Sequence, residues 1–577
     1  MKKRMLELQE QVSSHCRVIY PDQDPTWLTQ QLIELMGLDV KCKKPKPYQN
    51  HWDQQDVIAI TYGDSIEKEG EKPLHTLHNF FKEQFSDIIN SVHILPFYPW
   101  SSDDGFSVMN YKQVNEKLGD WPDVEAIAQD FRLMADLVIN HCSARSEWFE
   151  QFKRAHHPEK DYFFCAQPDD DLSAVVRPRT NPLLREVETA EGTRYVWCTF
   201  SHDQVDLNFN NPLLLFEIVS IINFYMERGI TIFRLDAIAF LWKEIGSSCL
   251  NLPQTHEMVR LIRTLIEYKN PRAIIITETN IPNRENLAYF GNANEAHVIY
   301  NFALPPLLLH GLITGNSFYL NNWLMSMPPA QDGTTYLNFI ASHDGIGLRP
   351  VEGILDDDQI KQITDTMQRF GGHISWRNLS QDEVRPYEVN ISLYDALSGT
   401  VEGKDEWQFE RFICAHTIML GLEGIPALYI HRLLATENDL TRLELSGNKR
   451  AINRHVWDCE TLQSCLDDEH SHHARVLQEL KRIIRIRTAQ AAFHPNATQY
   501  TMHLGEGVFG YWRQSRNRAQ SIFCVYNIED CVQELHLSQM NLVATQNWVD
   551  LLSGRVIDDL HQTLELEPYQ CLWIVNQ

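Results

Sequence analysis

Basic residues are in short supply in this 577-residue sequence. It has 51 Lys and Arg residues against 77 Asp and Glu residues, which gives a formal net charge of -26 at pH 7. Such a chain repels nucleic acid phosphates and anionic membrane surfaces, so neither is expected as a partner. A small anionic ligand would be repelled as well, and would therefore need a locally basic pocket.

Long apolar runs are also missing. No stretch offers the roughly 18 continuous apolar residues that a transmembrane helix needs. The opening residues, MKKRMLELQEQVSSHC, lack the apolar core of a secretory signal. We therefore expect no membrane anchor and a cytoplasmic location.

Paired cysteines are the third absence. Twelve cysteines occur singly between Cys16 and Cys571, without a CxxC pair. This spacing favours neither a zinc module nor a disulfide scaffold. Because 43% of the residues are hydrophobic and 22% are charged, the composition is that of an ordinary globular protein.

Three parts of the chain differ in their patterns. Residues 1–50 contain a helical segment, WLTQQLIELMGL, and then a Lys/Pro-rich linker, KCKKPKPYQN. Residues 51–486 alternate apolar runs with helical segments and form the predicted catalytic domain. Residues 487–577 contain short alternating segments such as GVFGYWR and SIFCVYNI, which predict a small antiparallel β domain.

Eight apolar runs recur in the central part: VIAITYG, SVHILPFYP, LMADLVINH, ITIFRLDAIAF, AIIITETN, HVIYNFALP, YLNFIASHD and GIPALYIH. Strands that alternate with helices predict a parallel sheet, and eight of them predict an α/β fold of the closed (β/α)8, or TIM, barrel type. Two gaps, at about 142–228 after the third strand and 345–410 after the seventh, are too long for simple connections. We expect each gap to form an inserted subdomain beside the site.

Polar side chains end four of these runs, where a barrel of this kind places its chemistry. They are Asp136, Asn140 and His141 in DLVINH, Arg234 and Asp236 in FRLDAIAF, Glu278 in ITETN, and His343 and Asp344 in ASHDGIG. Three of these carboxylates, Asp236, Glu278 and Asp344, are therefore expected to converge at one barrel mouth.

Retaining cleavage of a glycoside needs two carboxyl groups about 5–5.5 Å apart, one to attack the sugar and one to protonate the leaving oxygen. Arg234 precedes Asp236 by two residues and projects to the same face of its strand. It can therefore keep Asp236 ionised, and a low pKa suits a nucleophile.

Each of these residues has a simpler explanation when it is taken singly. A carboxylate at a strand end often caps a helix or forms a surface ion pair, and a single histidine is often structural. Converging Asp and His side chains could also bind a divalent ion, but no HxxxH or two-His-one-carboxylate spacing supports a metal site. We therefore expect neither a metal nor an organic cofactor.

Taken together and in this order, the four segments resemble the signature regions of glycoside hydrolase family 13, the alpha-amylase superfamily. The resemblance implies that Asp236 is the nucleophile and Glu278 the general acid/base. It implies that Asp344 stabilises the transition state and gathers the sugar hydroxyls. His141 and His343 would hydrogen-bond the glucose, beside Arg234.

Further motifs resemble landmarks of the sucrose phosphorylase-like subfamily: ITYGD, HILPFYPWSSDDGF, RPR, KEIGSSC, FALPPLLLH, SHDGIG, YEVN and INRH. By this resemblance, Asp103 and Phe106 close the base of a pocket for one glucose unit, and Arg454 is an additional clamp. Arg179 of RPR and Tyr387 of PYEVN resemble the phosphate-binding pair, one on each insertion. An arginine over the open side would attract phosphate by charge-assisted bonds. An arginine in an unplaced loop could equally form an ordinary surface salt bridge.

The acceptor loop departs from the sucrose phosphorylases, which typically carry an aspartate and then a glutamine around the tyrosine. This chain reads VRPYEVN, with Arg385 and Glu388 instead. Together with the N-terminal extension, this difference makes the chain resemble the glucosylglycerate phosphorylases. A guanidinium such as Arg385 can bind the carboxylate of glycerate with two hydrogen bonds, and a solvated loop charge is the alternative.

We therefore predict a retaining glycoside phosphorylase that converts an alpha-glucoside and phosphate into alpha-glucose 1-phosphate and an acceptor, with glucosylglycerate as the favoured substrate. The alternatives are a sucrose, sucrose 6'-phosphate or glucosylglycerol phosphorylase, and then an alpha-glucosidase or transglucosidase. A non-catalytic carbohydrate-binding relative is the remaining alternative, but such relatives typically lose catalytic carboxylates. The sequence does not predict an oligomeric state.

Overall fold

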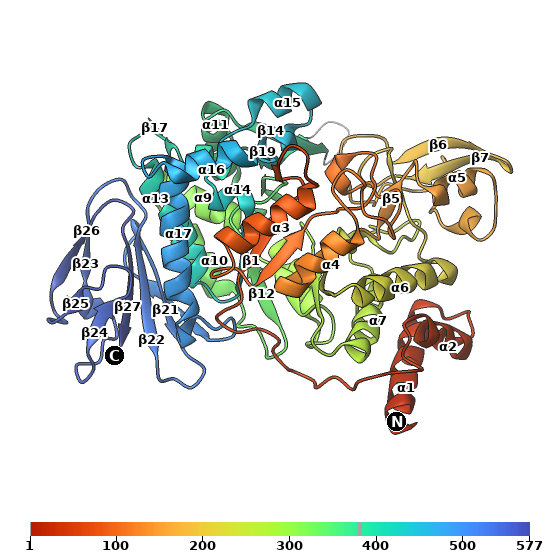
Figure 1. Ribbon diagram of the computed structural model, residues 1–577, viewed down its shortest axis with the longest axis horizontal. Helices are drawn as coiled ribbons and strands as arrows, with labels where there is room; N and C mark the ends of the chain where they lie inside the picture. Colours follow the sequence, from red (N-terminus) through yellow and green to blue (C-terminus); the bar gives the residue numbers. More distant parts are fainter. Residues whose placement is uncertain (1, 379–383, 577) are drawn as a thin grey trace.

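A closed barrel of eight parallel strands forms the centre of the computed structural model, which describes residues 2–378 and 384–576 (Figure 1). Around the barrel the strands follow the order β1 (Ile58–Thr61), β18 (Ile425–Tyr429), β12 (Thr335–Asn338), β11 (Val298–Tyr300), β10 (Ile274–Thr277), β9 (Ile230–Leu235), β4 (Arg132–Leu137) and β3 (Ser91–Ile94). Each of the eight apolar runs supplies one strand, so the predicted TIM barrel is confirmed.

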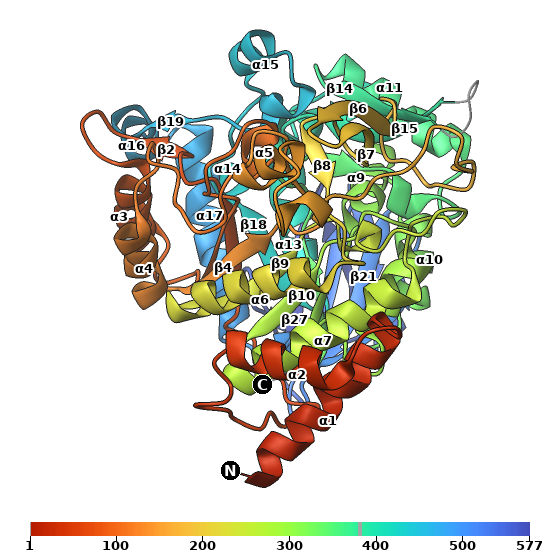
Figure 2. The same ribbon diagram turned by 90° about the vertical axis from the view of Figure 1, so that its right-hand side faces the viewer.

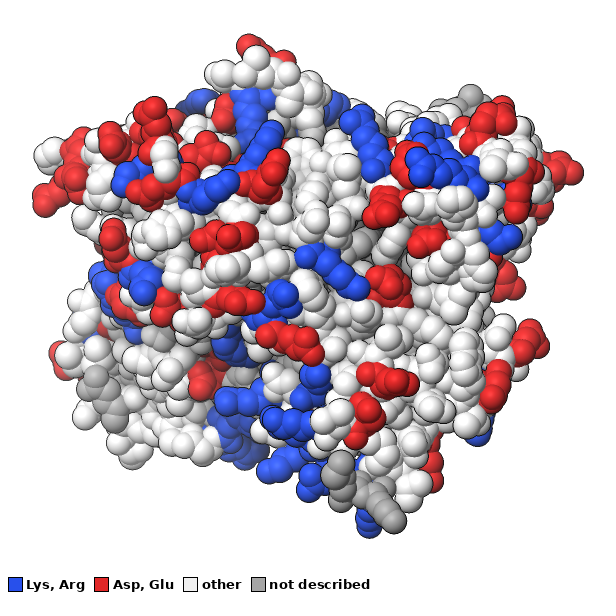
Figure 3. Space-filling model, turned by 45° about the vertical axis from the view of Figure 1, so that its right-hand side comes forward, with Lys and Arg blue, Asp and Glu red and all other residues white. Residues whose placement is uncertain are grey.

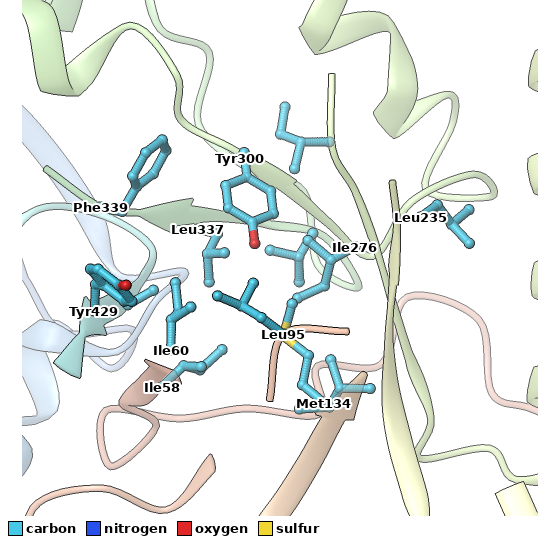
Figure 4. Close-up of a cluster of buried hydrophobic side chains, with 14 of the residues drawn as sticks. Ile58, Ile60, Leu95, Met134, Leu235, Ile276, Tyr300, Leu337, Phe339 and Tyr429 are labelled. Carbon is cyan, nitrogen blue, oxygen red and sulfur yellow. The ribbon is translucent and has the colours of Figure 1, made fainter. Parts of the chain in front are cut away.

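Apolar side chains fill the barrel, because parallel strands are covered on both faces and become nearly continuous hydrophobic runs. All four residues of β10, for example, are buried. Figure 4 shows Leu95, Met134, Ile276 and Leu337 pointing toward one another from different strand regions. The barrel is therefore a packed core, and its chemistry is confined to its rim.

Helices surround the barrel (Figure 1). The main ones are α3 (Pro73–Gln84), α4 (Trp121–Asp130), α6 (Pro212–Glu227), α7 (Pro253–Lys269), α9 (Leu304–Thr314), α10 (Phe318–Ser326), α13 (Gln408–Gly421) and α17 (His472–Thr488). A proline in the first turn helps to start α3, α4, α6, α7 and α9, where no helical N–H bond is lost. Asp120 and Asp123 add a capping box to α4.

Two insertions rise from the same end of the barrel, the upper end in Figures 1 and 2. The first follows β4 and contains α5 (Glu147–Lys153), the pair β5 (His141–Ser143) and β8 (Gln204–Asp206), and the hairpin β6 (Leu184–Thr189) and β7 (Gly192–Trp197). The second follows β12 and contains α11 (Asp357–Arg369) and the antiparallel sheet β13 (Ile346–Gly347), β15 (Val384–Asn390) and β14 (His373–Asn378). The expected insertions after strands three and seven are therefore present, while the residue limits of the domains stay predictions.

A six-stranded sheet forms the C-terminal part, at the left in Figure 1. Its order is β20 (Thr498–His503), β21 (Val508–Gln514), β22 (Ser521–Asn527), β27 (Cys571–Asn576), β24 (Trp548–Asp550) and β25 (Val556–Ile557). The pairs are antiparallel, as predicted, and a second pair, β23 (Gln533–His536) and β26 (Thr563–Leu566), packs nearby.

Two N-terminal helices, α1 (Lys2–Ile19) and α2 (Pro25–Leu35), contact α7 and α6. They lie at the lower end of the molecule in Figure 2, away from the insertions. Their buried side chains include Leu8, Val12, Leu28 and Leu32, so they extend the main core. Within the described ranges, no helix has both the length and the apolar character needed to cross a membrane.

Candidate active site

Asp236 and Glu278 follow two neighbouring barrel strands. The register pairs Leu235 of β9 with Thr277 of β10, so the next residues on each strand stand side by side. The N–H of Glu278 donates to the carbonyl oxygen of Leu235 at 3.0 Å and continues this pairing. Because neighbouring strands lie about 4.8 Å apart, the arrangement suits the short carboxyl separation of a retaining glycosidase.

Arg234 lies between the carboxyl groups and contacts them unequally. Its Nη1 donates to Asp236 Oδ1 at 2.7 Å, while its Nη2 lies 4.0 Å from Glu278 Oε2. Arg234 also bonds to buried Asp136, whose other oxygen lies 2.7 Å from His93 Nε2. Asp136 and His93 therefore fix the guanidinium that orients Asp236.

Burial raises the pKa of Glu278 to about 7, with Arg234 opposing and Asp236 adding to the rise. Burial also raises the pKa of Asp236 above its ordinary value, against the nearby Arg234. The expectation of a low pKa for Asp236 is therefore wrong, because desolvation and the charge of Asp136 outweigh the guanidinium. The direct bond from Arg234 still favours the ionised form of Asp236.

Ala237, directly after Asp236, has a left-handed backbone with φ of 48°. A residue with a side chain rarely adopts this conformation, which is characteristic of functional sites. It lets the N–H of Ala237 donate to Glu278 Oε2 at 2.9 Å. The backbone after the first carboxyl group therefore orients the second.

Asp344 follows β12 and lies among cations. Its Oδ1 is 2.7 Å from Arg450 Nη1 and 3.3 Å from Arg454 Nη2. Burial opposes ionisation, but the positive charges of Arg450 and Arg454 lower the pKa of Asp344 well below its usual range. Burial lowers the pKa of His343 to about 3, so its imidazole is neutral and stacks on Phe106 with ring centres 5.3 Å apart.

The base of the pocket is a loop in which Asp103 and Asp104 have positive φ angles of 53° and 44°. Arg454 donates to Asp104 Oδ2 at 2.7 Å and lies 3.7 Å from Asp103 Oδ1. Its Nε donates to the carbonyl oxygen of His343 at 3.1 Å. Arg454 therefore connects the loop at the predicted base of the pocket to the segment that contains Asp344.

The three carboxyl groups predicted to be catalytic open into one pocket. Its lining includes the predicted residues Asp103, Phe106, His141, Arg179, Arg234, Asp236, Glu278, Asp344 and Tyr387. His343 and Arg454 lie behind this lining, in the contacts described above.

Arg179 and Tyr387, one from each insertion, meet over the open side. The guanidinium carbon of Arg179 lies 5.1 Å from the centre of the Tyr387 ring and 5.5 Å from that of Phe200. Asn280 Nδ2 donates to the Tyr387 hydroxyl at 3.3 Å. Across residues 2–378 and 384–576, no carboxylate forms an ion pair with Arg179, so the pocket faces a positive charge that no side chain neutralises.

An outer cavity of ≈ 670 Å³ adjoins the pocket. The two share Asp103, Arg179, Phe200, Gln204, Tyr387 and Arg450. Glu388 lines the outer cavity but is only 2% exposed. Its carboxylate accepts from Arg450 Nη2 at 2.8 Å and Nε at 3.1 Å, so its charge is already paired.

Arg385 is placed differently from the other predicted residues. A regular strand would direct it to the same face as Tyr387, two residues later. The pairing of β14 with β15 shifts at Ser375/Trp376, and such a bulge turns side chains. Arg385 is exposed and lines a groove beside α11. The described residues that line the Asp236 and Glu278 pocket and the outer cavity do not include it.

Arg450 and Asn280 are the main site residues that the sequence did not predict. Asn280 lies two residues after Glu278 and so on the same side of the chain, a spacing that could have pointed to it. Arg450 lies four residues before Arg454 of the INRH motif. Its contacts join segments distant in the sequence, and no local pattern indicates them.

Several known proteins resemble this chain in sequence or in fold. Residues 88–327 match the family described as alpha amylase, catalytic domain. A glucosylglycerate phosphorylase of Spirochaeta thermophila is 41% identical over 90% of each chain, and one of Allomeiothermus silvanus is 38% identical over 99% of each. The crystal structure of a sucrose 6F-phosphate phosphorylase from Thermoanaerobacter thermosaccharolyticum has the same fold, with a TM-score of 0.72 and 23% identity over 89% of this chain and 98% of that one. The chain therefore belongs to the alpha-amylase family, glycoside hydrolase family 13, and within it to the phosphorylase subfamily.

Proposed function

We propose that this protein is a glucosylglycerate phosphorylase, which converts glucosylglycerate and phosphate into alpha-glucose 1-phosphate and glycerate. The observation that carries the proposal is the position of Arg179 beside Tyr387, over the open side of the Asp236 and Glu278 pocket. A hydrolase needs no cation there, whereas phosphate and glycerate are both anions. The relatives that align over nine-tenths or more of the chain carry the same activity in their names.

The first half-reaction breaks the glucoside. A carboxylate oxygen of Asp236 attacks the anomeric carbon, and the bond to the glyceryl oxygen breaks with its electron pair. Glu278 gives its proton to that oxygen, so glycerate leaves with its hydroxyl restored. The pKa of about 7 keeps a large part of Glu278 protonated near neutral pH.

In the second half-reaction a phosphate oxygen attacks the anomeric carbon of the glucosyl-enzyme. The bond to Asp236 breaks and its carboxylate is regenerated, while Glu278 accepts the proton from the attacking phosphate hydroxyl. Two inversions give net retention, so the product is the alpha anomer. Arg179 favours phosphate over water, because it offers a charge-assisted bond that water cannot match.

The glucose unit would be held at the closed end of the pocket. We propose that Asp344 and His141 bind its hydroxyls and that Phe106, with the stacked His343 ring behind it, packs against the sugar ring. Asp103 would bind at the base, with Arg454 behind it. Every step uses side chains of this chain, phosphate and the sugar.

For the acceptor, we propose that the glycerate carboxylate uses the charge of Arg179 when phosphate is absent. Arg385, the residue first expected for this role, lines the groove beside α11 instead. Glu388 does not repel glycerate strongly, because Arg450 pairs with its carboxylate.

The test is phosphorolysis by the purified enzyme. Glucosylglycerate, glucosylglycerol, sucrose and sucrose 6'-phosphate are each supplied with phosphate, and alpha-glucose 1-phosphate and glucose are measured. We expect glucose 1-phosphate from glucosylglycerate with the highest kcat/KM. Another preferred donor would overturn the acceptor assignment, and glucose formed at a rate independent of phosphate would overturn the phosphorylase assignment.

A further inference from the structure

Arg450 joins the two halves of the active site. It lies in the short 3-10 helix η6 (Lys449–Asn453), and Asn448 caps its backbone N–H at 3.0 Å. Its side chain reaches both the catalytic pocket and the outer cavity. One guanidinium thereby contacts Asp344 on the glucose side and Glu388 on the acceptor side.

All three guanidinium nitrogens of Arg450 contact a carboxylate oxygen. Nη1 contacts Asp344 at 2.7 Å, and Nε and Nη2 donate to the two oxygens of Glu388 at 3.1 and 2.8 Å. A bidentate arginine–carboxylate pair fixes both distance and orientation, which a lysine cannot reproduce. Arg450 therefore holds the two carboxylates in a defined relation.

Asn390 supports the same connection. Its Nδ2 donates to Glu388 Oε1 at 2.6 Å and to the carbonyl oxygen of Asp344 at 3.0 Å. The backbones also approach closely, since a Cβ at Gly345 would lie 2.3 Å from the carbonyl oxygen of Val389. Gly345 has φ of 102°, which favours glycine. The loop after Asp344 and strand β15 thus behave as one packed unit.

Tyr387 precedes Glu388 on β15 and is the residue that meets Arg179. Its carbonyl oxygen accepts from Leu348 N–H at 2.9 Å, so its backbone is tied to the Asp344 loop as well. Any displacement of Glu388 would move Tyr387 relative to the carboxyl groups that act on the sugar. A shift of about 1 Å in a positioning contact can cost on the order of a hundredfold in rate.

From these contacts we propose that Arg450 is a positioning residue that acts through Glu388 to hold Tyr387, and with it the phosphate subsite, in register with Asp344. Glu388 is then a structural partner of Arg450 and does not itself bind the acceptor. This inference rests on the proposed phosphorylase reaction. It predicts that loss of the Arg450–Glu388 pair harms transfer to phosphate more than cleavage of the donor.

The experiment compares Arg450→Lys, Glu388→Gln and the double variant with the wild type. Lysine keeps the positive charge but cannot form the bidentate pair of a guanidinium, while glutamine keeps the shape of glutamate and loses its charge. Glu444→Gln is the matched control, because it makes the same change at an exposed glutamate on α15 (Leu440–Ser446). Each protein is assayed for phosphorolysis, for hydrolysis of alpha-glucosyl fluoride without phosphate, and for its thermal unfolding midpoint.

We expect both single variants to raise the KM for phosphate and to lower phosphorolysis roughly 10- to 100-fold, with a smaller effect on fluoride hydrolysis. The double variant should lose little more than the worse single variant, because both act on one connection. Equal losses in the two reactions, or losses that multiply in the double variant, would overturn the proposal. A wild type without phosphorolysis would instead overturn the proposed function, and unfolding midpoints separate either result from misfolding.

Discussion

Asp236 is buried and Glu278 is largely buried, with 13% of its side chain exposed, and the two differ in their contact with Arg234. It bonds to Asp236 at 2.7 Å but lies 4.0 Å from Glu278, whose nearer partner is the neutral N–H of Ala237. Two carboxyl groups in different environments can hold different protonation states, as a nucleophile and an acid must. The geometry therefore supports the proposal that Asp236 is the nucleophile and Glu278 the acid.

The role of Asp236 can be tested with Asp236→Asn. The amide cannot form the ester bond to the anomeric carbon, and it weakens the contact with Arg234. We expect kcat for phosphorolysis to fall by at least about a thousandfold, with an unfolding midpoint near that of the wild type. Activity kept within about tenfold, which is about 1.4 kcal/mol of barrier, would show that another group attacks the sugar.

The proposed role of Glu278 can be tested by the pH dependence of kcat/KM. With a pKa of about 7, the protonated acid is present below that pH and is lost as the pH rises through it. The kcat/KM for glucosylglycerate should therefore fall above pH of about 7. With alpha-glucosyl fluoride, whose leaving group needs little protonation, this limb should be weak.

Glu278→Gln provides the complementary variant. It should slow cleavage of glucosylglycerate about 10²- to 10⁴-fold, remove the alkaline limb, and leave fluoride release much less affected. A loss of the same size on both donors would contradict the acid/base assignment.

Arg179 is the residue that we propose to determine the selectivity for phosphate over water. Arg179→Ala removes a charge that no carboxylate of the described chain neutralises, so the KM for phosphate should rise roughly 10- to 100-fold. The product ratio should shift from glucose 1-phosphate toward glucose, because water does not depend on that charge. Arg194→Ala, at an exposed arginine on β7 of the same insertion, should leave both quantities unchanged. An unaltered product ratio in the Arg179 variant would remove Arg179 from the phosphate subsite.

At the scale of elements, the N-terminal helices test whether stability and catalysis are separate. Leu32 of α2 is fully buried, whereas Leu6 of α1 is 58% exposed. Leu32→Ala should lower the stability by about 2–5 kcal/mol, seen as a lower thermal midpoint, and Leu6→Ala should change it little. Since α1 and α2 lie away from the insertions (Figure 2), kcat should stay near the wild-type value in both. A large fall in kcat for a folded Leu32 variant would show that the extension supports the site.

The secondary-structure elements also show which parts of the site can be predicted from sequence patterns. Each barrel strand is a short buried run, and strand ends of a closed barrel meet at one rim, so Asp236, Glu278 and Asp344 could be predicted from their places on the strands. Arg385 could not be placed, because its direction depends on the shift in pairing between β14 and β15. The bond from Arg450 to Glu388 spans 62 residues and arises only when the second insertion folds back over the rim. Burial of Asp236, which raises its pKa, is likewise a property of the assembled site.

On the scale of the whole molecule, the charge is distributed unevenly. Figure 3 shows Lys and Arg side chains gathered most densely near the bottom of this face, with Asp and Glu side chains spread over much of the remainder. The insertions lie at the opposite end. In a chain with a net charge of -26, the proposed phosphate subsite therefore depends on the local charges of its pocket. Within the described ranges, Arg179 faces the open side without a carboxylate ion pair.

The acceptor preference follows from this charge distribution. In the synthetic direction, with alpha-glucose 1-phosphate as donor, an anionic acceptor can occupy the place that phosphate leaves and use the same guanidinium. Glycerol and fructose gain nothing from it, and fructose 6-phosphate must fit a much larger body beside the Arg450–Glu388 pair. We expect D-glycerate to have the highest kcat/KM of these four, measured by phosphate release.

Because screening weakens charge attraction, the advantage of glycerate over glycerol should shrink as salt is raised from about 0.01 to 1 M, over which the screening length falls from about 30 to 3 Å. Glycerol or fructose preferred by tenfold or more would reject glycerate as the acceptor and leave the phosphorylase mechanism intact.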